Sequence, residues 1–181
     1  LLIIDQAFRV GDWVASPSIG EGTIEAVSLS TVKIRKFTKA IQTVPNGVIA
    51  SEPITNWSRM SNRRIKMDIG LTYSTTSEQF QRILTELRAF IANDDRVDHE
   101  VIEMVHLVRF NQSSIDINLY YFTKTIDWED WRTTVEDHML SFMKIIENSG
   151  TSIAFPTRSI YVEGLPDGIE VAESAKQAAN L

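Results

Sequence analysis

Over residues 11–54 the apolar positions fall in short clusters that turn-forming residues separate. Pro17, Gly20, Gly22 and the Pro45-Asn46-Gly47 run interrupt the apolar pattern, and these residue types suit the backbone conformations of turns. The clusters between them are rich in β-branched and aromatic residues: Trp13-Val14, residues 24–27, 32–34 and 41–44, and Val48-Ile49. Short strands at this close spacing are typical of a small β-barrel or sandwich, and the pattern predicts about five strands.

After residue 59 the pattern indicates longer elements. Apolar and polar residues alternate over residues 65–73, which is typical of a half-buried strand. Either Thr75 with Glu78 or Thr76 with Gln79 can form a capping box, which predicts the start of a helix. The apolar face of that helix then recurs every three or four positions, at Phe80, Ile83, Leu84, Leu87 and Ile91.

The next residues predict two more strands and a second helix. Residues 101–110 are apolar enough for a largely buried strand, residues 111–113 supply a turn, and residues 115–121 alternate as another strand. Asp127 can cap the second helix, which we expect to end near Gly150. The expected inward stripe of this helix is Trp128, Trp131, Val135, Met139, Phe142 and Ile146.

The order of these elements predicts the fold class. A short strand is expected at residues 152–155, and residues 158–163 suit another. The resulting β-α-β-β-α-β order is the ferredoxin-like arrangement. We therefore predict an α+β chain, with an Sm- or SH3-like barrel of about five strands at residues 9–60 and a ferredoxin-like α/β domain at residues 61–156. Residues 164–181 are polar and Ala-rich, and we expect a flexible tail there.

Charge divides the chain at about the same place. The net charge is −6, but residues 1–66 hold nine Lys or Arg against five Asp or Glu, a net of +4, whereas residues 67–181 have a net of −10. A basic module can lie near anionic lipid headgroups or nucleic acid, and an acidic one is repelled by both. Two ordinary solvated surfaces would explain the same division.

The composition excludes several kinds of site and segment. The chain has no cysteine, which excludes disulfides, thiolate metal sites and cysteine nucleophiles. Uniformly apolar runs, such as residues 1–4, are no longer than four residues, far short of the roughly 20 residues of a membrane-spanning helix. No secretory signal is recognisable. The abrupt apolar start suggests a piece cut from a longer chain.

No set of residues points to catalysis, a cofactor or a metal. The three histidines are His99, His106 and His138, and no two have the helical spacing of a zinc site, so packing or hydrogen bonding is the favoured role. The carboxylate pairs of the second helix flank its apolar stripe, as a solvated face would. Gly20-Glu21-Gly22 precedes a β-prone segment rather than the helix that a phosphate loop needs. We therefore expect a protein that is not an enzyme.

An RNA-binding module is the main alternative that the residues themselves suggest. Lys33, Arg35, Lys36 and Lys39 form a basic cluster, and Tyr120 and Phe122 share one strand face, as in sheets that stack bases. The Lys/Arg-Gly-aromatic motif of such sheets is absent, and the α/β half is acidic. These two facts argue against nucleic acid as a partner.

A series of motifs in the first third of the chain carries a family resemblance. The series is Phe-Arg-Val-Gly-Asp-Trp-Val from Phe8, Gly-Thr-Ile-Glu from Gly22, Thr-Val-Lys-Ile-Arg from Thr31, Val-Pro-Asn-Gly from Val44 and Ile-Thr-Asn-Trp-Ser-Arg from Ile54. It resembles the cytoplasmic β-domain of the small-conductance mechanosensitive channel family. Later motifs resemble the low-conductance branch of that family: residues 60–65, 69–73, 122–125, 128–131 and 154–156. One departure is Ala7, where many relatives have proline.

The resemblance implies the cytoplasmic vestibule of a tension-gated ion channel of the inner membrane. Transmembrane helices would precede this region, and residues 1–8 would be the end of the pore-lining helix and its link. Subunits would form a homoheptamer, in which β-domains make a ring below the bilayer and α/β domains a cage with side portals. Residues 157–163 would join a barrel that closes the cage. Permeating ions and the lipid bilayer are then the other partners.

The same resemblance and the pattern of exposed sheet edges suggest interface residues. A β-module of about fifty residues buries too little surface to be very stable alone, which favours an oligomer. The candidates at subunit interfaces are Trp13, Ile49, Trp57, Ile160 and Val162, although Trp13, Ile49 and Trp57 suit an ordinary core equally well. The basic candidates near the membrane are Arg9, Lys33, Arg35, Lys36 and Lys39.

Overall fold

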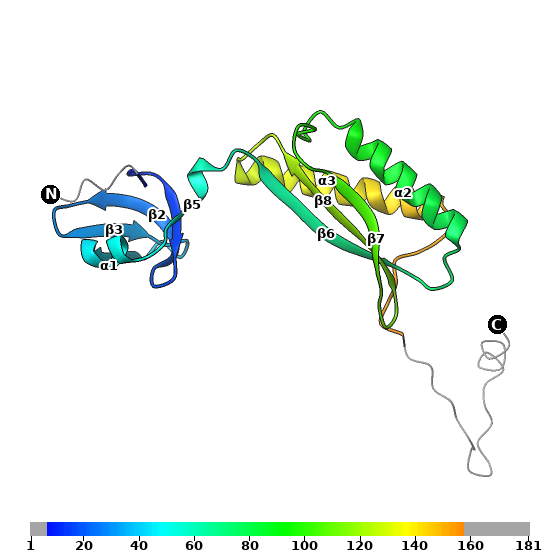
Figure 1. The fold of residues 1–181 in the computed structure, drawn as a ribbon, viewed down its shortest axis with the longest axis horizontal. Coiled ribbons are helices and arrows are strands. Elements are labelled where there is room, and N and C mark those ends of the chain that lie inside the picture. Colours follow the sequence, from blue (N-terminus) through cyan, green and yellow to red (C-terminus); the bar gives the residue numbers. More distant parts are fainter. Residues whose placement is uncertain (1–6, 158–181) are drawn as a thin grey trace, which may run out of the picture.

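Two domains, joined by a short segment, make up the structure, which is a computed structural model that describes residues 7–157 (Figure 1). The N-terminal β-domain has its own cluster of buried apolar residues, and the C-terminal α/β domain has another. The expected boundary near residue 60 follows the short 3-10 helix η1, Trp57–Arg59. The expected elements at residues 1–6 and 158–181 lie outside the described residues.

The β-domain is a five-stranded antiparallel sheet in the order β4-β3-β2-β1-β5. Its strands are β1 (Trp13–Ser16), β2 (Gly20–Val27), β3 (Thr31–Arg35), β4 (Ile41–Pro45) and β5 (Thr55–Asn56). Strand alternation turns every second side chain inward, so that Val32 and Ile34 of β3 are fully buried while Lys33 between them is exposed. The expected number of strands is confirmed.

One β-prone cluster of this domain is helical instead. Val48 and Ile49 lie in the short six-residue helix α1 (Asn46–Ser51), so the expectation of a strand there was wrong. The Asn46 side chain donates to the backbone carbonyls of Ser28 and Leu29 at 3.1 and 3.0 Å, which fixes the start of the helix against the β2–β3 turn. The helical turn places Ile49 in the core, where burial outweighs its preference for a strand.

The α/β domain has a three-stranded antiparallel sheet in the order β6-β8-β7, with both long helices packed into one core with it. Its elements are β6 (Arg63–Leu71), α2 (Ser77–Ala92), β7 (Met104–Phe110), β8 (Ile115–Thr123) and α3 (Trp128–Asn148). Ile153 forms an antiparallel bridge with Leu71, so the expected last strand is reduced to a bridge beside β6. This order is that of the ferredoxin-like fold.

Helix α2 begins at the second of the two capping boxes that the sequence allowed. The Thr76 side chain accepts from the Gln79 amide, and the Gln79 side chain accepts from the Thr76 amide at 2.9 Å. The predicted apolar face is confirmed, with Phe80, Ile83, Leu87 and Ile91 buried. This face covers the strand residues Ile65, Ile117 and Leu119 in the same core.

Strand β7 is more exposed than its sequence predicted. Only Val105 is buried, whereas Leu107, Val108 and Phe110 are 43%, 53% and 79% exposed, so the expectation of a largely buried strand was wrong. The strand lies at the edge of the sheet and its pairing with β8 shifts between Leu107 and Arg109. Because the strand pairs on one side only, its apolar residues have fewer neighbours to cover them.

Helix α3 buries part of the expected stripe: Phe142 and Ile146 lie in the core, and Trp131 and Val135 are partly buried against it. Asp127 caps it as predicted, accepting from the amides of Glu129 and Asp130. Its buried residues are Thr134, His138, Phe142 and Ile146, while Trp128 and Met139 are more than half exposed. The buried face differs because it includes two polar residues, Thr134 and His138, whose side chains are hydrogen-bonded. A search for apolar periodicity does not detect such residues. Among the described helices none is both long and apolar enough to cross a membrane.

Candidate functional site

All four tryptophans of the chain line one pocket between the two domains. The pocket has a volume of about 970 Å³ and is lined from the β-domain by Trp13, Glu21, Phe37 and Trp57. From the linking segment and the α/β domain its lining residues are Met60, Asn62, Arg63, Arg64, Phe122, Trp128 and Trp131. We call this set of residues the aromatic junction. Ligand pockets often lie at such domain boundaries and have mostly apolar walls.

Strand β1 and helix η1 position the β-domain side of the aromatic junction. The Trp13 ring lies 5.8 Å from the Phe37 ring in an edge-on arrangement and 5.8 Å from the Trp57 ring. The Trp13 amide donates to Ser58 Oγ at 2.8 Å, which ties β1 to η1. The three rings therefore form one connected wall, although they come from three different elements.

The first turn of α3 supplies the opposite wall. Trp128 and Trp131 are three residues apart, so they share one helix face, and their rings lie 5.5 Å apart. The Asp127 cap fixes the start of this helix and so the place of both rings. Trp128 is 58% exposed although it lies next to the domain boundary. The exposed ring is thus available to a molecule in the pocket.

Arg63, the first residue of β6, connects the two walls. Its guanidinium carbon lies 4.7 Å from the ring centre of Trp128 and 5.5 Å from those of Trp13 and Trp131. These distances are typical of cation–π contacts. The residue is only 7% exposed, and its Nη1 donates to the Ile126 carbonyl at 2.8 Å. Desolvation by burial lowers the pKa of Arg63 below its ordinary value.

The guanidinium of Arg63 has no close counterion. In residues 7–157, no carboxylate lies within ion-pairing distance of it, and Asp127 acts on it only at longer range. A buried charge without a charged partner is costly, and here ring faces offset part of that cost. The aromatic junction therefore has a buried positive charge beside flat apolar walls.

The structure places the predicted interface residues in different surroundings. Trp13 and Trp57 lie together in the aromatic junction. Ile49 is 3% exposed within the core of its own domain. Ile160 and Val162 lie outside the described residues. The sequence reasoning missed Arg63, although its position in the motif that begins at Met60 was a usable signal.

The basic candidates gather mostly on one hairpin. Lys33 and Arg35 lie on β3, and Lys36 and Lys39 lie in the turn to β4. Arg35 pairs with Glu25 and donates to the Lys39 carbonyl at 2.8 Å, and the Lys36 ammonium donates to the Ile19 carbonyl. Arg9 is exposed ahead of β1.

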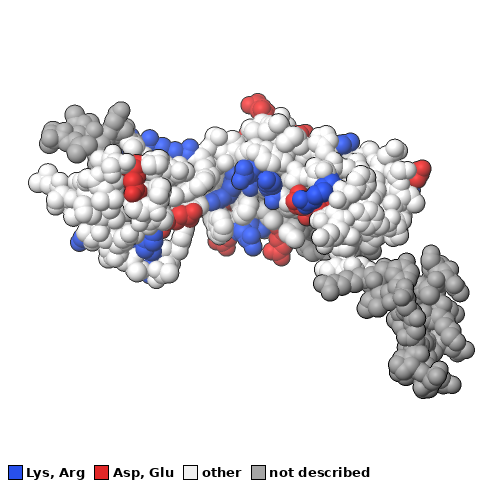
Figure 2. Space-filling model, turned by 60° about the horizontal axis from the view of Figure 1, so that its bottom comes forward, with Lys and Arg blue, Asp and Glu red and all other residues white. Residues whose placement is uncertain are grey.

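Lys and Arg side chains also gather between the two domains. On the face shown in Figure 2, blue side chains surround a recess at the centre of the view. The cations that line the pocket are Arg63 and Arg64, against the single carboxylate of Glu21. The balance of charge at the aromatic junction is therefore positive.

The aromatic face proposed for RNA has local partners. The rings of Tyr120 and Phe122 meet edge-on at 5.5 Å, and Arg64 lies over Tyr120 at 5.7 Å. The Asn118 side chain donates to Asp68 at 2.6 Å. These two residues lie opposite each other on β8 and β6, two positions along β8 from Tyr120. The sequence grouped these two rings correctly, and the structure adds a carboxylate on the same sheet, which opposes a polyanion.

A second polar cluster lies between α2 and α3. The buried His138 Nε2 lies 2.8 Å from Asp94 Oδ2, and its Nδ1 lies 2.7 Å from the Tyr121 hydroxyl. Arg96 pairs with both Asp94 and Asp137 at 2.8 Å. A neutral imidazole that donates from Nε2 and accepts at Nδ1 satisfies both neighbours. The expected hydrogen-bonding role of this histidine is confirmed.

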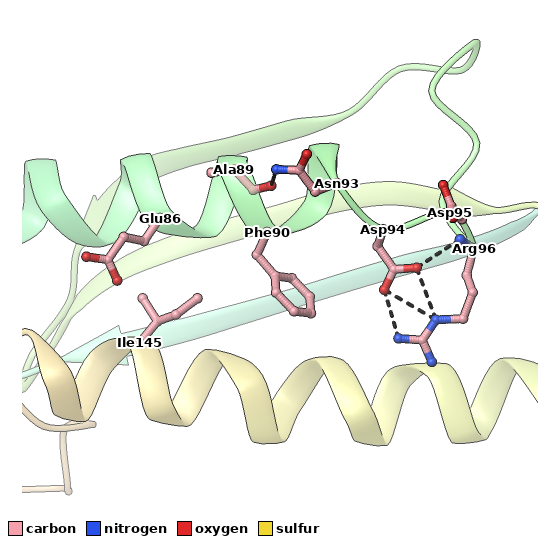
Figure 3. Close-up of a pocket in the computed structure, with 8 residues that line it drawn as sticks. All are labelled: Glu86, Ala89, Phe90, Asn93, Asp94, Asp95, Arg96 and Ile145. Carbon is pink, nitrogen blue, oxygen red and sulfur yellow. Dashed lines mark hydrogen bonds and ion pairs between the residues drawn. The ribbon is translucent and has the colours of Figure 1, made fainter.

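This cluster closes one end of a shallow groove of about 680 Å³ (Figure 3). Asp94 and Arg96 face each other there, and Phe90 of α2 and Ile145 of α3 lie farther along the groove. Arg96 holds the pKa of Asp94 far below its ordinary value. In the described part of the chain no three metal-ligating side chains converge, and His99 lies 3.2 Å from Glu103 at the surface.

We expect acid to destabilise the α/β domain through His138. Burial lowers the pKa of His138 more than the Asp94 carboxylate raises it. The unfolded imidazole binds its proton near pH 6.5, so below this pH the unfolded state holds more protons than the folded state. The free energy of unfolding then falls by at most about 1.4 kcal/mol per pH unit. Urea unfolding at several values between pH 8 and pH 5 measures this slope.

Asp94 also contributes to the free energy of unfolding, but this contribution is lost only in stronger acid, because the pKa of Asp94 in the folded state lies below the ordinary 3.8. The variant His138→Gln should therefore lose most of the slope above pH 5. His106→Gln, which changes an exposed histidine of β7, should keep it. An unchanged slope in His138→Gln would contradict this assignment.

Both domains match models of mechanosensitive channel domains. The model described as the β-domain of the mechanosensitive ion channel matches residues 1–59, and the model of the MscS C-terminal domain matches residues 65–153. The chain belongs to the MscS family. The match to the two domains, in this order, agrees with the predicted and observed fold. A family of channels points to a protein that is not an enzyme.

Curated relatives extend the similarity over almost the whole chain. An uncharacterized MscS family protein of Helicobacter pylori is 35% identical over 206 residues, which cover 97% of this chain and 33% of that protein. The low conductance mechanosensitive channel YnaI of Escherichia coli is 32% identical over 166 residues, covering 91% of this chain and 48% of YnaI. This MscS-family chain thus spans between a third and a half of the length of these relatives.

A solved structure confirms the fold independently. The cryo-EM structure of Arabidopsis thaliana MSL1 matches with a TM-score of 0.77 and 23% identity, over 83% of this chain and 54% of that one. At this identity the match shows the fold alone. The predicted fold class, a β-domain followed by a ferredoxin-like domain, is confirmed.

Proposed function

We propose that this chain forms the cytoplasmic vestibule of a tension-gated ion channel. The observation that carries the proposal is the β-domain followed directly by the MscS C-terminal domain, each with its own core. Membrane tension opens a pore formed by helices outside this sequence, in a cell's inner membrane. The vestibule screens solutes and holds the subunits in register. Family membership favours this function over an RNA-binding module.

The proposed assembly is a homoheptamer, with the β-domains in a ring and the α/β domains in a cage with side portals. Its support is the family and the exposed edge residues of β7, which one copy of the chain leaves uncovered. Ile160 and Val162 remain proposed contacts between subunits, whereas Trp13 and Trp57 lie in the aromatic junction within one subunit. Native mass spectrometry of the full-length protein in detergent tests the assembly. Heptamers are the expected result, and monomers alone would overturn it.

The five basic candidates are proposed to lie near the headgroups. This placement rests on the positive charge of residues 1–66 against the negative charge of the rest. The similarity to YnaI supports the further proposal that the channel is one of low conductance. Permeating ions and the bilayer are the remaining partners under this proposal.

Pressure applied to membrane patches with the reconstituted full-length protein tests the function. The expected result is a current that rises steeply with tension and is absent from patches without protein. A protein that inserts normally and assembles, but gives no tension-dependent current, would contradict the proposal. RNA binding would instead give a salt-dependent shift of labelled RNA on addition of this chain.

A further inference from the structure

The aromatic junction has the size and walls of a small-molecule site. Its volume of about 970 Å³ lies within the range of ligand pockets, and such pockets combine apolar walls with a few placed polar groups. Four of its rings belong to the tryptophans that face each other across the two domains. Flat apolar walls of this kind favour a flat apolar molecule, because rings stack well on rings.

The charge of the pocket selects an anion. Arg63 brings a buried guanidinium whose hydrogen bond to the Ile126 carbonyl uses a single N–H donor of five. Arg64 adds a second cation to the lining, and Glu21 is the single acid there. A carboxylate, sulfonate or phosphate would supply the counterion that no described side chain provides to Arg63.

We propose that the aromatic junction binds a small aromatic anion, whose flat body stacks on the tryptophans and whose acidic group pairs with Arg63. The ligand contacts residues of both domains, so it holds them in one relative position. The site is formed by residues of this chain alone, so it does not depend on the proposed channel function. The ligand class follows from the walls and charge of the pocket alone.

Anilinonaphthalene sulfonate is a suitable probe, because it is a flat aromatic anion that accepts excitation from tryptophan. Titrated into the 181-residue chain, it is expected to quench tryptophan emission with a saturable curve. N-phenyl-naphthylamine has the same rings without the sulfonate, and it should bind about tenfold more weakly, as expected for the loss of one charge-assisted hydrogen bond. Equal binding of the two probes, or no saturation, would overturn the proposal.

Variants assign the binding to Arg63. Arg63→Gln should weaken sulfonate binding about tenfold and leave binding of the uncharged probe unchanged. Arg132→Gln is the matched control, since Arg132 lies over the Trp131 ring at 6.0 Å but outside the pocket lining. If both variants behave like the parent chain, the guanidinium is not the recognition group.

The variant Glu21→Gln keeps the proposal testable if Arg63→Gln fails to fold. Glu21 is exposed at the edge of the pocket, and removal of its charge should tighten sulfonate binding at least about twofold. Octyl sulfate, which has a charge on a flexible chain, should compete poorly with the probe. Strong competition by octyl sulfate would assign the pocket to acyl chains, and an unchanged Glu21→Gln would contradict recognition by charge.

Discussion

Replacing Ile34 with alanine is expected to lower the free energy of unfolding of the β-domain by about 3 kcal/mol. Ile34 is fully buried on β3, within a core that has eight buried apolar residues in the described part of the chain. Removal of its side chain leaves a cavity that so small a core cannot fill. Because the whole stability of a small domain is about 5 kcal/mol, most of it would be lost. Calorimetry would then show the β-domain melting well before the rest of the chain.

Ile41→Ala is the control for this experiment. Ile41 lies on the neighbouring strand β4 and is 50% exposed, so its replacement should change the free energy of unfolding by less than about 1 kcal/mol. The α/β domain has a separate core and should keep its melting temperature in both variants. A single transition that shifts as a whole would show instead that the aromatic junction couples the two domains.

Replacing Asp94 with alanine is expected to lower the free energy of unfolding of the α/β domain by about 3 kcal/mol. The carboxylate is the acceptor for His138 Nε2, for the Arg96 guanidinium and for the Arg96 amide. Of these donors the fully buried imidazole matters most, because its N–H would be left without a partner. The partly exposed Arg96 adds little. Urea unfolding at pH 7.5 measures the change.

Asp95→Ala offers a matched control, since Asp95 is the next residue in the chain and is exposed. This variant should stay within about 0.5 kcal/mol of the parent. The double variant Asp94→Ala, His138→Leu should recover part of the loss, because the unpaired imidazole is removed with its partner. A loss of equal size in Asp95→Ala would show that the negative charge of this turn is what matters, rather than the hydrogen bond to His138.

The sequence predicted most of the elements because their signals are local. The capping residues Thr76 and Asp127 and the alternation in β6 lie within single elements, and the structure confirms them. The errors arose where a distant contact decides the outcome. Val48 and Ile49 form a helical turn because Asn46 is bonded to the β2–β3 turn, and β7 is exposed because it lies at a sheet edge.

The candidate site was predicted only in part for the same reason. Trp13 and Trp57 were predicted as candidates for subunit interfaces, and the structure instead places both in the aromatic junction. Arg63 was missed because its role depends on Trp128 and Trp131, which lie more than sixty positions later in the chain. Likewise, His138 can be buried only because Asp94 and Tyr121 form hydrogen bonds with its two ring nitrogens. Periodicity alone gives no sign of such pairs.

The separate cores also set the order in which the chain can fold during synthesis. The β-domain core closes between Phe8 and Ile49, so the ribosome delivers all of it before β6 begins. The α/β domain instead needs Ile153 to reach Leu71 and complete its sheet, so it must wait for its last residues. Domains fold as units, the N-terminal one first. The β-domain can thus be folded, with its apolar core already covered, while the second domain is still being made.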